Sequence, residues 1–134
     1  MLNQPRYVKY KKTRKGKLQK LEYKSNYLTF GTIGLKTIES GILNFRQIEA
    51  ARQAISRKIK RKGKIWIKIF PFISITSKPI GTRMGKGKGS ISHWGAKVKG
   101  GTVLFEVSGV NLSIVIKALK TGGAKLPVKT KIVI

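Results

Sequence analysis

Acid–base groups are scarce in this sequence of 134 residues. There is no aspartate, the only histidine is His93, and the four carboxylates are Glu22, Glu39, Glu49 and Glu106. General acid–base catalysis, a catalytic triad and a metal site each need several such groups close together. The scattered glutamates argue against an enzyme, and we expect no catalytic residue, no metal site and no cofactor.

Cysteine is absent, which excludes disulfides, zinc ribbons and thiol catalysis and leaves the redox compartment open. Long apolar runs are also missing. The stretch 65–75 is short and contains Lys68 and Pro71, so the sequence predicts no membrane span. The N-terminus is basic and lacks the apolar centre of a secretory signal, whereas a transit peptide, also basic and acid-poor, is harder to exclude.

Against these absences stands a large excess of positive charge. The chain has 30 lysine and arginine residues against four acids, so its formal net charge is +26. Such a charge opposes compaction by self-repulsion unless a polyanion neutralises it. At this length we expect one domain that buries roughly two thirds of its unfolded surface. The composition therefore predicts a nucleic-acid-binding protein, and charge alone supports RNA and DNA equally.

The first 26 residues are basic and carry three tyrosines and few aliphatic side chains. Such a segment buries too little apolar surface to fold alone, so we predict a basic extended N-terminal arm over residues 1–26. Its cations can follow phosphates while its tyrosines stack on unpaired bases. The alternative is a disordered tail that only solubilises the protein. The predicted RNA-binding residues of the arm are Arg6, Lys9, Lys11, Lys12, Arg14 and Lys15.

The clearest predicted helix spans residues 45–62. Asn44 and Gln47 have capping-box spacing at its start, and Gly63 stands where a left-handed residue would end it. Its last turn is almost entirely basic. Those cations complement the helix dipole, but they are more numerous than a dipole needs, so we favour contact with RNA backbone. The predicted RNA-binding residues of this helix are Arg46, Arg57, Lys60, Arg61 and Lys62.

The remaining pattern predicts an α+β domain over residues 27–134, with a compact mixed sheet and two helices. The second helix is expected over 111–120, with Val115, Ile116 and Leu119 in the core, although Gly122–Gly123 weaken it. Residues 91–98 and 102–107 read as a β-hairpin. Further strands are predicted at 28–38, 64–70 and 128–134, a turn at 38–42, and an irregular connection at 72–80.

Glycine and lysine alternate in residues 83–89, which we predict to form a projecting loop. Alternate glycines permit positive φ and let the backbone approach an anion closely, while the lysines add charge at the same place. The spacing matches neither of the common phosphate-loop motifs. The alternative is a solvated flexible loop. The predicted RNA-binding residues here are Arg83, Met84, Gly85, Lys86, Gly87, Lys88 and Gly89.

Two stretches resemble the signatures of the bacterial-type ribosomal protein L16 family. They are residues 60–71, Lys-Arg-Lys-Gly-Lys-Ile-Trp-Ile-Lys-Ile-Phe-Pro, and the loop 83–89 with Trp94 at the expected distance. The resemblance continues through residues 47–52, 103–110 and 124–130, so it covers essentially the whole chain. Two departures are Gly122–Gly123, where the family usually has an alanine-rich helix, and Ser92–His93, where an acid and an aromatic are commoner.

The resemblance implies a structural component of the large ribosomal subunit, without chemistry of its own. It implies binding to large-subunit ribosomal RNA beside the aminoacyl-tRNA site near the peptidyl-transferase centre, with tRNA and neighbouring large-subunit proteins as partners. By the same resemblance, Arg83, Lys86 and Lys88 face RNA or tRNA. The alternative function is a sequence-independent, architectural nucleic-acid-binding protein.

The lysine- and isoleucine-rich composition without aspartate resembles that of an AT-rich genome. The chain also starts where the L16 family starts, so we expect no transit extension. A mitochondrial ribosome is the predicted location, with a plastid or the cytoplasm of an AT-rich bacterium as alternatives.

Overall fold

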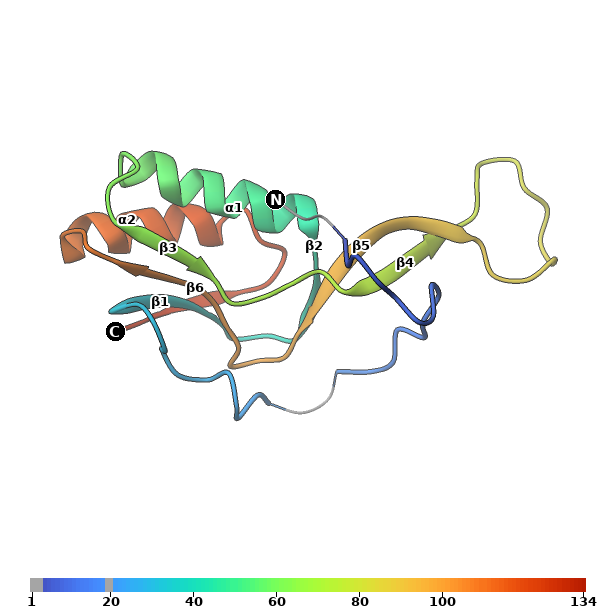
Figure 1. Ribbon diagram of the computed structural model, residues 1–134, viewed down its shortest axis with the longest axis horizontal. Coiled ribbons are helices and arrows are strands. Elements are labelled where there is room, and N and C mark those ends of the chain that lie inside the picture. The colour runs from blue at the N-terminus through green and yellow to red at the C-terminus, as the bar shows by residue number, and fades with distance from the viewer. Residues whose placement is uncertain (1–3, 19–20) are drawn as a thin grey trace.

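A computed structural model describes residues 4–18 and 21–134 of the chain, so parts of the predicted arm lie outside the described residues. An extended N-terminal segment leads into strands and helices, with four consecutive strands between the two helices (Figure 1). In chain order they are β1 (Ile33–Thr37), β2 (Gly41–Asn44), α1 (Phe45–Lys58), β3 (Lys64–Ile67), β4 (Ile73–Ser77), β5 (Ser90–Val98), β6 (Val103–Ser108), α2 (Leu112–Gly123) and β7 (Thr130–Val133).

The strands form two antiparallel sheets. The four-stranded sheet has the order β3-β6-β1-β7, and the three-stranded sheet has the order β2-β5-β4. The prediction of an α+β fold with two helices is confirmed, whereas the single mixed sheet is wrong. The apolar pattern of each strand indicates which face is buried, but it does not indicate which strands become neighbours.

The two helices lie side by side on one face of the four-stranded sheet (Figure 1). Ile48 and Ile55 of α1, Leu119 of α2 and Phe105 of β6 are all buried in the common core. Gly122 lets the helices approach closely, because a Cβ atom at this position would lie 2.6 Å from Cγ1 of Ile55. The glycine that weakens α2 as an isolated helix is therefore required by its packing.

The predicted β-hairpin is wrong in its pairing, although both strands exist. β5 pairs with β2 and β4, and β6 pairs with β1 and β3. The connection between them is held instead by the end of β1. There, the Thr37 N–H donates to the Thr102 carbonyl, the Gly101 N–H donates to the Thr37 carbonyl, and the Thr37 hydroxyl donates to the Lys99 carbonyl. These bonds direct the chain from one sheet into the other.

Local signals set the start of α1, and its end differs from the prediction. The capping box is confirmed, because Gln47 Oε1 accepts from the Asn44 N–H at 2.9 Å. The helix ends at Lys58 instead of residue 62. Lys60 and Arg61 are left-handed, with φ of 53° and 60°, and their N–H groups donate to the carbonyls of Arg57 and Ser56. This is a Schellman motif with Lys60, not Gly63, in the left-handed C′ position.

The other boundaries differ by a few residues from the prediction. β1, β3 and β7 are shorter than the strands predicted at 28–38, 64–70 and 128–134. The second helix, α2, extends beyond the predicted residue 120 to Gly123. Val115 and Leu119 are buried as predicted, whereas Ile116 is half-buried. Two segments predicted to be irregular are strands, because each pairs with β5: the turn at 38–42 overlaps β2, and the connection at 72–80 contains β4.

Candidate nucleic-acid interface

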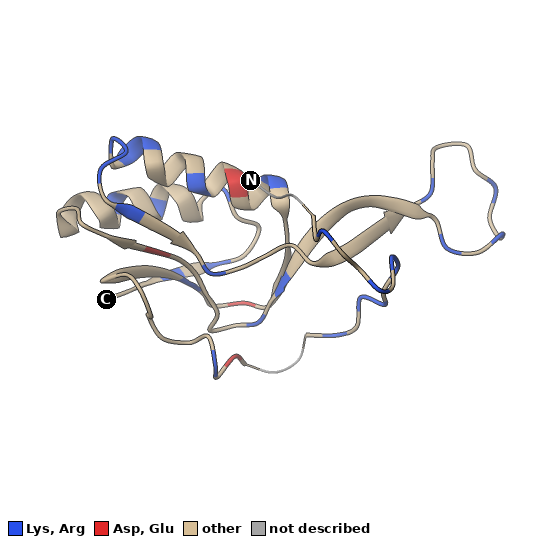
Figure 2. Ribbon diagram, in the orientation of Figure 1, with Lys and Arg blue, Asp and Glu red and all other residues tan. Residues whose placement is uncertain are grey.

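All four acids are paired with cations inside the protein. The nitrogen–oxygen separations are 2.6 Å for Arg52–Glu49, 3.2 Å for Lys129–Glu39, 3.5 Å for Lys68–Glu106 and 3.7 Å for Lys99–Glu22. None of these glutamates lies in the arm's described residues 4–18, in the loop 78–89 or in the turn after α1. Lysine and arginine are therefore the only charged residues within those three regions (Figure 2).

The glycine-rich loop joins β4 to β5 and extends far from the rest of the fold (Figure 1). Arg83, Lys86 and Lys88 are exposed, and Met84 is 99% exposed. Gly85, Lys86 and Gly87 all adopt positive φ. A Cβ atom added at either of these two glycines would meet nothing within 4 Å. The space beside both glycines is therefore open to a partner.

The arm and the loop touch through two lysines. Lys12 Nζ donates to the Lys88 carbonyl at 3.0 Å, and Lys88 Nζ donates to the Thr13 carbonyl at 2.7 Å. The six predicted cations of the arm are all exposed. Residues separated by more than seventy positions thus form one continuous basic surface, which we call the loop-end surface: the described arm residues 4–18 together with residues 78–89.

A second basic surface lies at the C-terminal end of α1, at the other end of the molecule from the loop (Figures 1 and 2). We call residues 52–62 the helix-end surface. Ile59 is buried and anchors the turn, while Arg57, Lys60, Arg61 and Lys62 are exposed. Arg52, Arg57 and Arg61 line a hollow of about 310 Å³. Arg52 is held by Glu49, whose hydrogen bond raises the pKa of the guanidinium.

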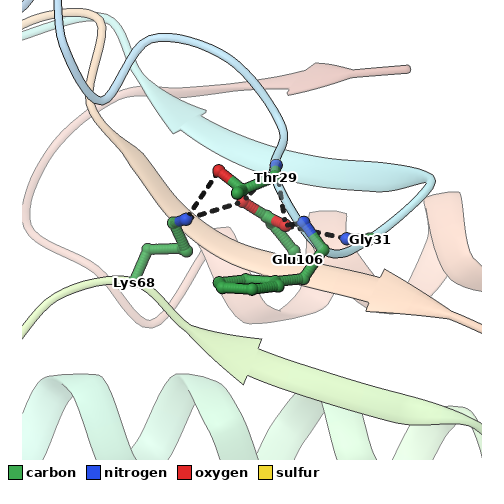
Figure 3. Close-up of polar contacts among 5 residues, drawn as sticks. Thr29, Gly31, Lys68 and Glu106 are labelled. Atoms are coloured by element: carbon green, nitrogen blue, oxygen red, sulfur yellow. Dashed lines mark hydrogen bonds and ion pairs between the residues drawn. The ribbon is translucent and has the colours of Figure 1, made fainter.

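A buried carboxylate fastens the N-terminal segment to the sheet (Figure 3). Glu106 of β6 is fully buried, and its Oε2 accepts from the N–H groups of Phe30 at 2.6 Å and Gly31 at 2.8 Å. The Thr29 N–H and the Lys68 ammonium also approach its oxygens. Burial alone would raise the pKa of Glu106, but these N–H donors and the Lys68 charge outweigh burial and lower the pKa below its usual value.

The structure brings together some predicted site residues and separates others. Arm and loop cations meet, whereas Arg57 and Lys60–Lys62 form their own surface and Arg46 lies at the opposite end of α1.

Two cations near these surfaces were not predicted from the sequence. Arg52 lines the same hollow as Arg57 and Arg61, and Lys78 Nζ donates to the Gly85 carbonyl at 2.6 Å. Helical spacing could have identified Arg52, because residues four apart lie on the same face of a helix, and Ser56, four residues after Arg52, precedes Arg57 directly.

Within residues 4–18 and 21–134, no group of three or more His, Asp or Glu side chains is placed to hold a metal ion. In the same part of the chain, no helix is both long enough and apolar enough to cross a membrane.

Comparison with known proteins decides the family. The family model described as ribosomal protein L16p/L10e matches residues 5–133. The chain belongs to this family. Among similar proteins, the large ribosomal subunit protein uL16 of Borrelia recurrentis is 51% identical over 130 residues, which cover 97% of this chain and 94% of the relative. The uL16 proteins of Borreliella burgdorferi and Borrelia turicatae have the same coverage, with 51% and 49% identity.

Membership of the L16p/L10e family confirms the resemblance inferred from residues 60–71 and 83–89. It also identifies the chain as a ribosomal protein rather than an enzyme, in agreement with its scarcity of acid–base groups. The uL16 relatives named above are bacterial proteins.

Proposed function

We propose that this chain is a structural constituent of the large ribosomal subunit. In this proposal, it binds large-subunit ribosomal RNA and helps to form the aminoacyl-tRNA site beside the peptidyl-transferase centre, without chemistry of its own. The observation that carries the proposal is the gathering of exposed cations on two surfaces at opposite ends of a small fold. One protein with two such surfaces can connect separate RNA elements.

The two surfaces have different proposed partners. The helix-end surface is a fixed arrangement on a buried anchor, which suits ribosomal RNA that stays bound. The loop-end surface consists of residues 4–18 of the proposed arm (1–26) and a loop, residues 78–89, that leaves the proposed 27–134 domain. This arrangement suits contact with tRNA as well as RNA. The exposed Met84 and Ile80 of the loop also suit contact with neighbouring large-subunit proteins.

Composition and relatives point to different compartments for the ribosome that contains this protein. The prediction of a mitochondrial copy has no support among the relatives named above, and these bacterial proteins favour the bacterial alternative. The architectural DNA-binding alternative is tested by sedimentation of a native lysate. The ribosomal proposal requires co-migration with large subunits that survives DNase treatment, and release by DNase would overturn it.

For the helix-end surface, we expect the salt dependence of RNA binding to change on substitution. Each phosphate contact contributes about 0.7–0.9 to the steepness of log K against log salt. Replacing Arg57, Lys60 and Arg61 together by glutamine should therefore flatten this slope by about 2–3 units. The matched control replaces three exposed lysines of the α2 region, Lys117, Lys120 and Lys125, by glutamine. An equal change of slope in both variants would show that only total charge matters.

For the loop, function and stability should separate. Changing Lys86 and Lys88 to alanine should alter the free energy of unfolding by no more than about 0.5 kcal/mol each, because both are exposed. Binding of aminoacyl-tRNA to ribosomes carrying the variant should weaken by about tenfold, since the variant loses charged hydrogen bonds to phosphate. The control is the same change at Lys117 and Lys120. Wild-type affinity across a range of salt would refute the tRNA-facing role.

A further inference from the structure

An open cavity of about 720 Å³ lies between the N-terminal segment and the body of the protein. Residues 4–8 and Lys11 form one wall, and the start of α1 with residues 91–94 of β5 forms the other. A volume of this size is within the range of small-ligand sites. The cavity is separate from the glycine loop and from the helix-end surface, and neither proposed surface uses its body wall.

The cavity combines cations with aromatic rings. Arg6, Lys11 and Arg46 contribute positive charge, and none of the described residues that line the cavity is acidic. Phe45, His93 and Trp94 are only half-buried, and Tyr7 is 95% exposed. None of these rings belongs to the buried core, so packing of the core does not account for their gathering at one place.

The start of α1 supplies a ready stacking surface. Phe45 is the first residue of the helix, directly after the Asn44 cap, and the guanidinium carbon of Arg46 lies 5.8 Å from the centre of the Phe45 ring. The helix start fixes both residues relative to β5. Planar guanidinium groups and aromatic rings are the side chains on which unpaired bases stack.

We infer that this cavity binds one unpaired nucleotide of RNA, an inference that rests on the proposed RNA binding. The base stacks on the Phe45–Arg46 pair beside Trp94, and the phosphate meets Arg6 and Lys11. A single-stranded nucleotide offers both a flat ring and a negative charge. These match the aromatic rings and the cations that line the cavity. An inorganic anion would leave the rings unused, and an apolar peptide would leave three cations buried without partners.

The experiment uses the full chain and the fluorescence of Trp94. The sequence has two tryptophans, so Trp66→Phe leaves Trp94 as the only reporter, and phenylalanine keeps the ring that stacks on Phe30. The probes are a ten-nucleotide oligoadenylate, a duplex RNA of the same length and an abasic decamer, each labelled so that anisotropy reports saturation. We expect the oligoadenylate alone to quench Trp94 at saturation.

Two variants test the stacking surface. Phe45→Leu and Arg46→Gln should each weaken oligoadenylate binding by roughly 5- to 100-fold, as expected for loss of one stacked base. Binding of the duplex should change far less. The matched control is Phe72→Leu, which removes an exposed ring outside this cavity. Circular dichroism checks the fold, and Arg46→Gln keeps the test valid if Phe45→Leu destabilises the helix.

The inference and the proposed function fail in different ways. Equal quenching by the abasic decamer would reduce the cavity to a phosphate site and overturn the nucleotide assignment. Unchanged oligoadenylate affinity in both variants would also overturn it. In either case, duplex binding that still depends on Arg57, Lys60 and Arg61 would leave the proposed RNA-binding function intact.

Discussion

Replacing Glu106 by alanine should lower the free energy of unfolding by about 3–5 kcal/mol. The loss follows from removing one partner of a buried ion pair, which leaves Lys68 without its carboxylate. It also leaves the Phe30 and Gly31 N–H groups without their acceptor. Chemical denaturation of the full chain measures the change.

Glu106→Gln should cost less, about 2 kcal/mol, because the amide oxygen can still accept from Phe30 and Gly31. Its NH₂ group would then face Lys68 and the Thr29 N–H, which are both donors. The matched control is Glu49→Gln, which removes a carboxylate paired with Arg52 on the half-exposed face of α1. A surface pair contributes at most about 1 kcal/mol. Equal costs at positions 49 and 106 would contradict the anchoring role of Glu106.

The same carboxylate should make the anchor sensitive to acid. Folding lowers the pKa of Glu106 from its usual 4.5. Its ionised form therefore stabilises the fold fully above about pH 4.5, and this contribution is lost as pH falls through the lower folded pKa. The protection of the Phe30 and Gly31 amides against hydrogen exchange, measured relative to the intrinsic exchange rate at each pH, should fall over that window. Glu106→Gln has no carboxylate to protonate, so the protection of these amides in that variant should change little over the same window.

Local chemistry was predictable from the sequence wherever neighbouring residues decide the structure. The Asn44–Gln47 capping box involves residues three apart, and the side chains that close it are both in the sequence pattern. The alternation around Trp66 likewise predicted β3. The glycine loop could be singled out because its composition leaves nothing able to pack.

The pairing of strands could not be predicted in this way, because it depends on residues that are distant in the sequence. The strands ending at Val98 and beginning at Val103 looked like a hairpin because only three or four residues separate them. Their separation depends on Thr37, more than sixty positions earlier, whose backbone and hydroxyl groups hold the connection. No pattern within residues 90–108 carries that information.

The candidate site shows the same division. Its cations were visible as charge runs, but the meeting of Lys12 with Lys88 is a tertiary contact. Glu106 was visible only as an isolated acid in the apolar strand Val103–Ser108. The left-handed Lys60 and Arg61 were hidden for another reason, because lysine and arginine are good helix formers and extended the predicted helix beyond its true end.

Gly63→Ala should destabilise the protein by about 2–5 kcal/mol, because two separate penalties add. Gly63 has φ of +75°, a region that costs an L-residue about 1–2 kcal/mol. A Cβ atom there would also collide with the backbone oxygen of Ser108 and lie 2.6 Å from Cγ2 of Val110. Relieving the collision requires a backbone shift where β3 leaves the basic turn, which costs a further 1–3 kcal/mol or so.

Gly87→Ala is the matched control, since Gly87 has nearly the same φ, +78°, but a Cβ atom there would meet nothing within 4 Å. This substitution should cost about 1–2 kcal/mol, the backbone penalty alone. Denaturation of both variants therefore separates the penalty of conformation from the penalty of contact. Equal losses would mean that the turn after α1 yields freely to the added methyl group. Such a result would mean that the helix-end surface is not held rigidly in the protein. The salt-slope prediction, which depends on a preformed arrangement of Arg57, Lys60 and Arg61, would then lose its basis.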